Sequence, residues 1–279
     1  MPELPEVENI AIGLRDILQG RSLQKAEVHS PVILKGPGQS HWQQFFHDLS
    51  GQGIEQVIRR AKRLQWVMKS EAALVIQLGM TGKFLRGEVG EEAPNHTHMT
   101  FTLDNGESLY YVDARRFGRV WLFDHWQDED SDILMEQAGM GSLGPDALVM
   151  RLAHFVQMLH SPRPIKALLL DQTRIAGLGN IYVDESLFAT GIRPTRAADE
   201  CLEEAEVLLK NIKSILRRAI KAGGTTFSDY RNAYGDMGRF RQRLQVYQRH
   251  GHPCKQCGTT LERWVVAGRG SHVCPECQR

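Results

Sequence analysis

Apolar and polar residues follow one another along the chain in a pattern that predicts a leading helix, then strands, then a helical second half. In residues 5–19 the apolar side chains recur every three or four positions, which places them on one face of an amphipathic helix. Pro5 suits the first helical position, and Gly20 suits the position after the last turn. The first residues of the chain therefore lead directly into a helix N-terminus.

Residues 22–124 alternate between apolar and polar side chains, as half-buried strands do. Met99–Leu103 and Ser108–Val112 flank the turn sequence Asp104-Asn105-Gly106, which is a hairpin signal. Strands with one apolar face bury that face well against a second sheet. This region is therefore predicted to be mostly strand and to form two packed sheets.

A polar linker with Gly and Pro, residues 125–150, is predicted to precede a helical region that runs from about 148 to 222. The helices expected there are Ile165–Gln172, Asn180–Thr190 and roughly 197–222. Residues 225–243 show no periodicity and are predicted to be a long loop. Long loops in compact domains are often functional, so this one is a candidate functional segment.

The composition is that of a globular, soluble protein. The chain has 279 residues, of which 42% are hydrophobic and 24% charged, and its length suggests about two domains. A run of about 18 apolar residues does not occur, so no membrane span is expected. The acidic start of the chain is not followed by an apolar signal segment, which predicts a cytoplasmic rather than a secreted protein.

Charge is divided unevenly although the net charge is only +1. Residues 211–279 contain 13 Lys and Arg against 4 Asp and Glu, whereas the rest of the chain contains 21 against 29. A basic C-terminal quarter on an acidic body favours a polyanion as the partner. On charge alone, a solvated basic face is an equally good interpretation.

Four of the five cysteines lie in the last 26 residues, as Cys254-x-x-Cys257 and Cys274-x-x-Cys277. This spacing is typical of a structural zinc site, because each pair forms a tight knuckle and four thiolates fill the tetrahedral coordination of the ion. Two disulfides would be the alternative, but they need an oxidising compartment. The remaining cysteine, Cys201, is predicted to be a small buried apolar group.

The N-terminal sequence offers a nucleophile. Removal of Met1 would leave Pro2 as a free secondary amine, which titrates near pH 8 and so is partly neutral. A neutral amine can attack an electrophilic carbon and collapse to an iminium, which makes neighbouring protons acidic. Glu3 and Glu6 lie nearby at a helix start, where a carboxyl can move protons. Taken alone, two glutamates in a first turn are better explained as ordinary capping residues.

Eight short motifs that stand in order along the chain resemble formamidopyrimidine-DNA glycosylase, the bacterial family that removes 8-oxoguanine and ring-opened purines. The motifs are Met1–Glu8, Arg59–Lys62, Leu78–Gly82, Asp113–Gly118, Gly177–Tyr182, Glu185–Phe188, Gly223–Thr226 and Arg269–Cys274. They run from one end of the chain to the other, so the resemblance covers all of it.

The resemblance implies an α+β multidomain fold with one structural zinc ion. Residues 1–125 would form an N-terminal catalytic β-sandwich with a leading helix. Residues 126–243 would form a helix–two-turn–helix DNA-binding domain with a base-capping loop, and residues 244–279 a zinc-finger β-hairpin. The implied partner is double-stranded DNA with oxidised bases, bound between the domains by a monomer that associates with the nucleoid when it acts.

The resemblance also implies catalytic roles. Pro2 would attack the sugar C1′, expel the base and form a Schiff base, with Glu6 in a supporting role. Glu3 would donate the proton that helps to open the sugar ring. Lys62 would assist β-elimination and Arg269 the δ-elimination that follows. Arg269 is placed at the tip of the expected hairpin, where a cation could meet phosphate.

An enzyme that acts on a stacked base must flip it out and fill the gap. By resemblance, Met80, Arg115 and Phe117 form the inserted wedge, since Met and Phe can replace lost stacking and Arg can hydrogen-bond the orphaned base. If the resemblance to the family is set aside, packing of Met80 and Phe117 within strands is the better explanation of these two residues. Asn180 begins a helix after a glycine turn, which suits phosphate binding. His96 and Arg163 are weaker phosphate candidates.

The chain departs from the usual family pattern at three places. Ala114 stands where proline is usual, and Asn95–His98 replaces a commoner Lys-His-Asp-His. The Arg-rich segment Tyr234–Arg243 has Met237 where proline is common and Arg239 where an aromatic is common. In relatives this loop covers the flipped base, so the departures concern base preference rather than the chemistry.

Two alternatives remain. An endonuclease VIII-type glycosylase would prefer oxidised pyrimidines, but that group usually begins Pro-Glu-Gly-Pro and lacks the Arg-Arg-Phe wedge, so Leu4 and Phe117 argue against it. A catalytically silent protein that binds DNA lesions would need the wedge and zinc hairpin without a free amine. The presence of Pro2, Glu3 and Lys62 argues against that alternative.

Overall fold

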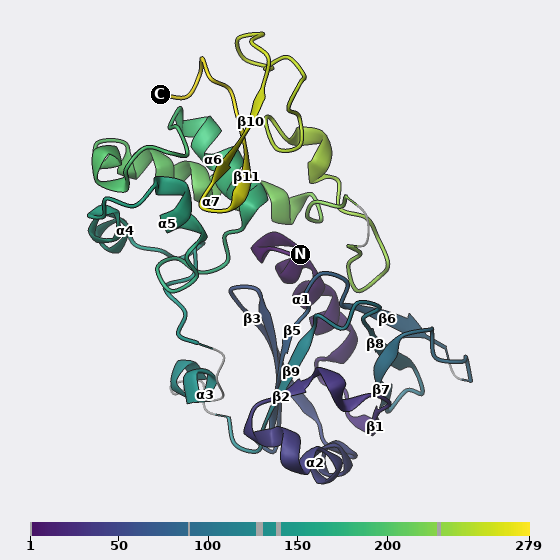
Figure 1. Cartoon of the computed structure of the whole chain (residues 1–279). Coiled ribbons are helices and arrows are strands. Elements are labelled where there is room, and N and C mark those ends of the chain that lie inside the picture. The colour runs from purple at the N-terminus through teal and green to yellow at the C-terminus, as the bar shows by residue number, and fades with distance from the viewer. Residues whose placement is uncertain (1, 89, 127–130, 138–140, 228–229) are drawn as a thin grey trace. The chain divides into compact units, whose positions relative to one another are not determined.

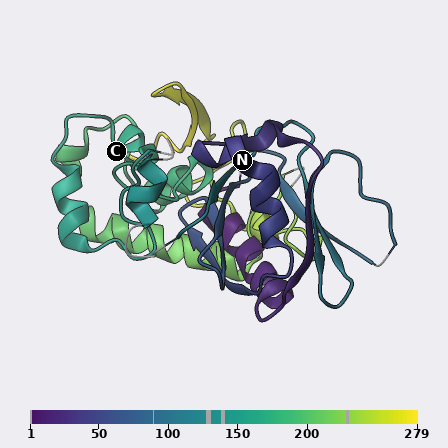
Figure 2. The same cartoon turned by 90° about the horizontal axis from the view of Figure 1, so that it is seen from below.

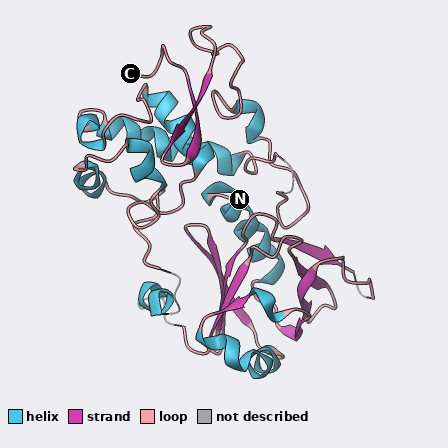
Figure 3. Cartoon of the chain, viewed as in Figure 1, coloured by secondary structure: helices cyan, strands magenta, loops and turns pink. Residues whose placement is uncertain are grey.

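A computed structural model describes residues 2–88, 90–126, 131–137, 141–227 and 230–279. The chain forms two compact units (Figure 1). Unit 1 contains residues 1–142 together with Gly223–Gly238, and unit 2 contains Leu143–Ala222 together with Arg239–Arg279. Strands dominate unit 1 and helices dominate unit 2, as Figure 3 shows by colour. No helix among the described residues is long and apolar enough to cross a bilayer.

Unit 1 is a β-sandwich with helices at its margins. Its helices are α1 (Leu4–Leu18), α2 (Trp42–Leu49) and α3 (Ser131–Gln137). Its strands are β1 (Leu23–Val28), β2 (Leu34–Lys35), β3 (Ile54–Arg60), β4 (Arg63–Met68), β5 (Ala73–Gln77), β6 (Lys83–Gly87), β7 (Thr97–Leu103), β8 (Ser108–Val112) and β9 (Arg119–Phe123). Short 3₁₀ turns cover Pro31–Ile33 and Pro37–His41.

The strands form two sheets, as the alternating sequence predicts. One sheet has the order β1-β7-β8-β6 and the other the order β2-β9-β5-β4-β3. Their inner faces share one core, in which the rings of Trp66 on β4 and Phe101 on β7 lie 4.9 Å apart between centroids. The expected hairpin also forms, because Leu103 and Ser108 end and begin paired strands around Asp104–Gly106. The apolar face of α1 completes this core and packs on β3.

Unit 2 consists of helices and one hairpin. Its helices are α4 (Leu152–Leu159), α5 (Ile165–Leu170), α6 (Asn180–Thr190) and α7 (Ala205–Lys221), with 3₁₀ turns at Ala198–Cys201 and Phe240–Arg243. The strands β10 (Glu262–Val266) and β11 (Arg269–Val273) pair antiparallel near the C-terminus. Figure 2 shows α7 as a long green helix and the hairpin in yellow.

Three sequence-based expectations need correction. The strand-rich region contains the helix α2, whose Phe45, Phe46 and Leu49 pack into the sandwich core. The expected linker contains α3, whose Met135 joins a second cluster with Trp121 and Trp126. The helix expected from about residue 197 begins only at Ala205, after a 3₁₀ turn. In each case burial of a few apolar side chains decides the local structure, and periodicity over so few residues cannot show this.

Candidate active site and nucleic-acid interface

The first turn of α1 brings Glu3 and Glu6 together next to Pro2. The Glu3 side chain accepts a hydrogen bond from the backbone at Glu6, and Glu6 Oε2 accepts one from the Glu3 N–H at 2.9 Å. This reciprocal capping box fixes both carboxyl groups at the positive end of the helix. Pro2 is buried, and Glu3 and Glu6 are only 4% and 2% exposed. The three residues predicted at this end of the chain therefore share one enclosed environment.

Glu6 also holds a segment that is distant in sequence. Its Oε1 accepts the N–H of Thr225 at 2.8 Å, inside the Gly223–Thr226 motif. Gly224 has φ +85° and approaches Glu6 so closely that a Cβ would lie 3.1 Å from Oε1. The Tyr230 hydroxyl donates to the carbonyl oxygens of Glu6 and Gly223, at 3.3 and 3.0 Å. Burial, with the nearby Glu6 carboxylate, raises the pKa of Tyr230, so this phenol remains a donor.

Lys62 lies in the tight turn between β3 and β4 and is half-buried. Ala61 beside it takes a left-handed conformation with φ 56°. Arg59 donates to the Ala61 carbonyl oxygen at 3.1 Å, and its Nε donates to Glu8 Oε2 on α1 at 2.5 Å. Glu8 thereby connects the helix that follows Pro2 with the turn that carries Lys62.

A buried aspartate joins the two loops that carry the predicted wedge. Asp113 is fully buried and accepts the Thr81 hydroxyl on one oxygen and the Gly118 N–H, at 2.6 Å, on the other. Thr81 Oγ1 in turn accepts the Arg115 N–H at 3.2 Å. Gly79, with φ +65°, lies against the Phe117 backbone, where a Cβ would be 2.5 Å from a carbonyl carbon. A side chain at Gly79 would therefore force the two loops apart.

These loops present the predicted wedge side chains to solvent. Met80 is 43% exposed and Phe117 is 48% exposed, which is unusual for large apolar side chains. The Arg115 guanidinium lies 4.7 Å from the centroid of the Phe117 ring. Strand packing, the ordinary explanation of Met80 and Phe117, does not account for them here. His96 is exposed and left-handed at φ 67°, and its carbonyl accepts the Asp113 N–H at 3.1 Å.

The four cysteines near the C-terminus form one cluster in unit 2. All four Sγ atoms of Cys254, Cys257, Cys274 and Cys277 lie within 4.8 Å of one another. Tetrahedral zinc with Zn–S bonds of about 2.3 Å requires sulfurs roughly 3.8 Å apart. The observed separations of 4.0 Å for Cys254–Cys277 and 3.4 Å for Cys257–Cys274 fit this requirement. Four thiolates leave no open coordination position, so the zinc is structural.

The hairpin is anchored to α5 and α6 by buried charges. Lys166 is fully buried and donates to Asp184 at 2.6 Å and to the Gly270 carbonyl oxygen at 3.0 Å. The second Asp184 oxygen accepts the His272 N–H at 2.9 Å and lies 3.1 Å from His272 Nδ1. Each buried charge thus has an opposite charge or a hydrogen-bond partner, as burial requires. These contacts fix the strand that begins at Arg269.

The remaining predicted residues of unit 2 differ in what they offer to a phosphate. Arg269 is exposed at the start of β11. Asn180 begins α6, and its Nδ2 donates one hydrogen to the Gly270 carbonyl oxygen at 2.9 Å. The second hydrogen of this amide group can be donated to a phosphate oxygen. Arg163 is 47% exposed but already paired with Asp171 at 2.9 Å, and this hydrogen bond holds the pKa of Asp171 below its usual value.

Sequence reasoning assigned no role to the buried and half-buried acids that position these groups. Asp113, Glu8 and Asp184 each hold a loop, turn or hairpin that carries a predicted site residue. Glu185 accepts the backbone N–H groups of Gln245, Val246 and Tyr247 and so binds the chain that leads to the zinc segment. Burial raises the pKa of Glu185. These acids lie inside or beside the eight family motifs, and that position could have indicated a role. Their hydrogen-bond partners lie too far away in the sequence to be predicted from it.

Comparison with protein families gives three matches in order along the chain. Residues 1–120 match the formamidopyrimidine-DNA glycosylase N-terminal domain, and residues 143–231 match its H2TH domain. Residues 251–279 match a zinc finger found in FPG and IleRS. Together these segments cover most of the chain and contain every predicted site residue.

Full-length relatives and solved structures agree with these matches. The formamidopyrimidine-DNA glycosylase of Enterococcus faecalis is 41% identical over 100% of this chain and 98% of its own, and that of Geobacillus kaustophilus is 38% identical over 100% of both. The MutM (Fpg) structure from Thermus thermophilus has a TM-score of 0.83 at 38% identity, covering 99% of this chain and 98% of that one. Lactococcus lactis Fpg in complex with abasic-site DNA has a TM-score of 0.88 at 32% identity, with full coverage of both chains.

Proposed function

The chain belongs to the formamidopyrimidine-DNA glycosylase family, and we propose that it excises oxidised purines from double-stranded DNA and cuts the strand at the resulting site. It is a DNA glycosylase with lyase activity at abasic sites, and it uses one structural zinc ion. The observation that carries the proposal is the buried N-terminal turn, where two fixed carboxyl groups accompany Pro2. Met1, which would have to be absent, lies outside the described residues.

The proposed reaction begins at the Pro2 nitrogen. Its lone pair attacks C1′ of the damaged nucleotide while the bond from C1′ to the base breaks, and the base leaves with that electron pair and takes up a proton. The nitrogen, having lost its own proton, then expels the sugar ring oxygen, which receives a proton from Glu3. The product is an iminium between nitrogen and C1′, and its positive charge acidifies the proton on C2′.

Strand cleavage follows from that acidity. Loss of the C2′ proton expels the 3′ phosphate with its bonding electrons, which is the β-elimination, and a second proton loss expels the 5′ phosphate. We assign assistance of the first elimination to Lys62 and of the second to Arg269. The half-buried turn of Lys62 and the exposed, anchored strand start of Arg269 support this assignment. Glu6 supports the site by holding Thr225 and the helix cap together.

The same proposal assigns DNA contacts. Met80, Arg115 and Phe117 fill the gap left by the flipped base, which their exposure on two joined loops supports. Asn180 binds phosphate through the start of α6, and exposed His96 is a further phosphate contact. Arg163 is the weakest of these candidates because Asp171 already neutralises it.

We also retain the three domains 1–125, 126–243 and 244–279 as functional divisions, with action at the nucleoid. The three family matches support the order of these domains. The contacts of the structure add that Gly223–Gly238, inside the second domain, belongs with unit 1. The Arg-rich segment is thereby divided, with Tyr234–Gly238 in the unit that contains Pro2 and Arg239–Arg243 in unit 2.

Borohydride trapping tests the reaction. The chain without Met1 is mixed with a duplex that contains 8-oxoguanine opposite cytosine, and borohydride is added to reduce the iminium. We expect a covalent protein–DNA adduct whose sugar maps to Pro2 by mass spectrometry. The adduct should be lost in Pro2→Gly and in protein that retains Met1, because the secondary amine is then absent or blocked.

Three other outcomes would redirect the proposal. An adduct with thymine glycol duplex but not with 8-oxoguanine duplex would indicate the pyrimidine-specific class. Tight binding of lesion DNA without any adduct would indicate a silent binder. A sugar attached to a lysine would remove Pro2 from the mechanism.

A further inference from the structure

A groove in unit 2, which we call the α4–α7 groove, lies between the start of α4 and one face of α7. Its first wall is Val149–Leu152, and its second wall is formed by α7 side chains at positions 206, 209, 210, 213 and 217. Positions 206, 210, 213 and 217 are four, three and four residues apart, so they form a stripe along one face of the helix. The space between the walls is about 510 Å³, and all of its lining belongs to unit 2.

Both walls of the groove are fixed by the fold. The Asp146 carbonyl oxygen accepts the N–H groups of Val149 and Met150, at 3.1 and 2.9 Å, which closes the turn of the first wall. Lys213 on α7 donates to the Met150 carbonyl oxygen at 2.6 Å, so a hydrogen bond joins the two walls. Met150 and Leu209 are buried and hold the two walls in the core of the unit. The groove is therefore formed before any ligand binds.

Two large apolar side chains on the first wall are exposed to solvent. Val149 is 72% exposed and Leu152 is 40% exposed, and both line the groove. The helix α4 begins at Leu152 but packs through Phe155 and Leu159, which are fully buried. Neighbouring apolar side chains that stay exposed are typical of a surface that binds another molecule. The first wall therefore offers apolar contacts that the protein itself does not use.

The groove is also basic. Arg151 on the first wall and Lys210 and Arg217 on the second wall are exposed, and Lys213 is half-buried between them. Within the described ranges of the chain, no acidic group pairs with Arg151, Lys210 or Arg217. Glu206 lies one turn before Lys210 and forms no ion pair with it in the same described ranges. Cations on both walls without a counter-charge favour an anionic ligand.

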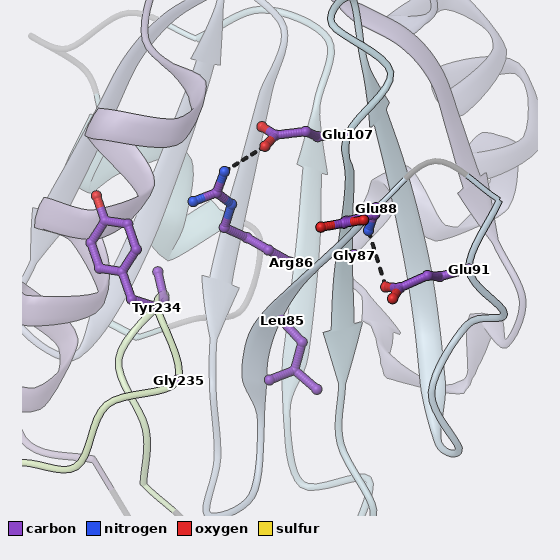
Figure 4. A pocket seen from close by; sticks show the side chains of 9 residues that line it. Leu85, Arg86, Gly87, Glu88, Glu91, Glu107, Tyr234 and Gly235 are labelled. Carbon is purple, nitrogen blue, oxygen red and sulfur yellow. Dashed lines mark hydrogen bonds and ion pairs between the residues drawn. The ribbon is translucent and has the colours of Figure 1, made fainter.

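A pocket in unit 1 has a similar size but a different charge (Figure 4). Its volume is about 540 Å³, and its Arg86 is paired with Glu107. Glu88 and Glu91 add negative charge to the lining, and Glu91 accepts the Glu88 N–H at 3.0 Å. An anion gains little there, because the cation is already neutralised. The unpaired cations of the α4–α7 groove are therefore a property of that groove and not of its size.

The groove differs in position from the DNA contacts proposed for unit 2. Arg269 begins β11, and Asn180 donates to Gly270 on the same strand, so these two candidates lie together. In Figure 2 the yellow hairpin and the green helix α7 lie at opposite edges of unit 2. Contacts with phosphates also make no use of exposed apolar side chains such as Val149 and Leu152. These observations favour an acidic protein segment over DNA as the occupant.

We propose that the α4–α7 groove binds a short acidic segment of a partner protein, in which apolar side chains stand between Asp or Glu residues. The apolar side chains of the segment cover Val149 and Leu152, and its carboxylates pair with Arg151 on one wall and Lys210 on the other. The stripe on α7 is about 17 Å long, which matches an amphipathic helix of about twelve residues. The proposed reaction uses no residue of the groove, so each proposal can fail without the other.

Fluorescence anisotropy with a labelled probe peptide tests the proposal. The probe has about twelve residues, in which leucines stand between aspartates, and it is titrated with the full-length, zinc-loaded protein. We expect saturable binding that weakens as salt rises, because the charges of the groove are exposed. Replacement of the leucines by serine, or of the aspartates by asparagine, should raise the Kd by about tenfold or more.

Variants on both walls show whether the probe lies in the groove. Arg151→Glu and Lys210→Glu should each raise the Kd about three- to tenfold, because each removes an attraction and adds a repulsion. Val149→Ser should raise it about tenfold through lost apolar burial. These side chains are exposed, so the variants should fold as the wild type does. Lys221→Glu makes the same charge change in the last turn of α7, outside the groove, and should leave the Kd unchanged.

Lesion duplex distinguishes a protein segment from DNA as the ligand. With 8-oxoguanine duplex at saturation the Kd of the probe should be unchanged, and Lys210→Glu should bind that duplex as tightly as the wild type. Displacement of the probe by duplex, weaker duplex binding by Lys210→Glu, or equal effects of Lys210→Glu and Lys221→Glu on the probe would overturn the proposal. Absence of probe binding would also overturn it. Probe binding by a protein that forms no borohydride adduct would reject the proposed function and keep the groove.

Discussion

The Tyr111 side chain shows how one buried polar atom limits stability at the residue scale. Its hydroxyl lies inside the sandwich and, among the described residues, has no hydrogen-bond partner. Burial raises its pKa strongly, and the Asp113 carboxylate adds to the shift. Gly118 leaves the space that the hydroxyl occupies, since a Cβ there would overlap it at 1.9 Å. The hydroxyl therefore fills volume but lacks the bond that would offset its desolvation.

Replacement of Tyr111 by Phe should leave the free energy of unfolding unchanged or raise it by about 1 kcal/mol, because an unsatisfied buried hydroxyl costs about 1–3 kcal/mol. Urea unfolding measures the change. Tyr230→Phe is the matched variant, and its effect should have the opposite sign because the Tyr230 hydroxyl makes two hydrogen bonds. It should lower the free energy of unfolding by about 1 kcal/mol. A larger loss in Tyr111→Phe than in Tyr230→Phe would mean that the hydroxyl of Tyr111 is satisfied in solution.

Residues whose chemistry depends on neighbours in sequence could be predicted. The four cysteines come together as their spacing indicates, and Glu3 and Glu6 form the cap expected three residues apart. The partners of Glu6 and Asp113 could not be predicted in this way. Thr225 is 219 positions from Glu6, and only the folded sandwich brings the two together.

At the scale of elements, α1 is the part of unit 1 on which the candidate site depends. Its first turn carries the capped glutamates, Glu8 binds the turn before Lys62, and Asp16 accepts the Tyr234 hydroxyl. Glu8 and Arg59 are 18% and 8% exposed, so their ion pair is largely shielded from water. Loss of one partner leaves the other buried without its counter-charge.

The shielded pair predicts a clear contrast between two glutamates. Glu8→Gln should lower the free energy of unfolding by about 2 kcal/mol, because Arg59 keeps its charge in a buried place. Glu27→Gln, which breaks an exposed pair with Lys25, should change it by less than about 0.5 kcal/mol. Chemical denaturation of both variants tests this, and equal losses would refute the role given to Glu8. Glu8→Gln should also slow strand cleavage at abasic sites through the loosened turn of Lys62.

Helices with clear start and stop residues in the sequence could be predicted, whereas a short helix without them could not. The helix Asn180–Thr190 has the predicted bounds, because a glycine turn precedes it and Gly191 in a left-handed conformation ends it. The helix Trp42–Leu49 was missed, since eight residues give too little periodicity among strands. Its stability comes from packing on the sandwich core, and single-sequence patterns do not report such packing.

At the scale of the whole molecule, the two units should respond differently to loss of zinc. The hairpin lacks a core of its own, so metal binding supplies its folding free energy. Chelation should unfold β10 and β11, release the Gly270 and His272 contacts of α5 and α6, and abolish binding of lesion duplex. The sandwich around Trp66 and Phe101 has its own core and should stay folded.

Amide exchange and DNA binding, measured on the same verified zinc-free protein, test this difference. Protection should be lost in Glu262–Val266 and kept in Arg63–Met68 and Ala73–Gln77. Undiminished DNA binding by zinc-free protein would contradict the assigned role of the hairpin. Simultaneous loss of protection in both units would contradict their independence.

The segment Gly223–Gly238 returns to unit 1 after the chain has already built most of unit 2. The polypeptide therefore passes between units after Ser142, after Ala222 and again after Gly238. Truncation at one position cannot yield unit 1 alone, because a fragment that ends at Ser142 leaves Glu6 without the Thr225 amide. A fragment that ends at Gly238 contains all of unit 1 but also residues 143–222 of unit 2. Premature termination of synthesis before Thr225, or a single proteolytic cut before Thr225 followed by separation of the fragments, should therefore yield no fragment that retains partial repair activity.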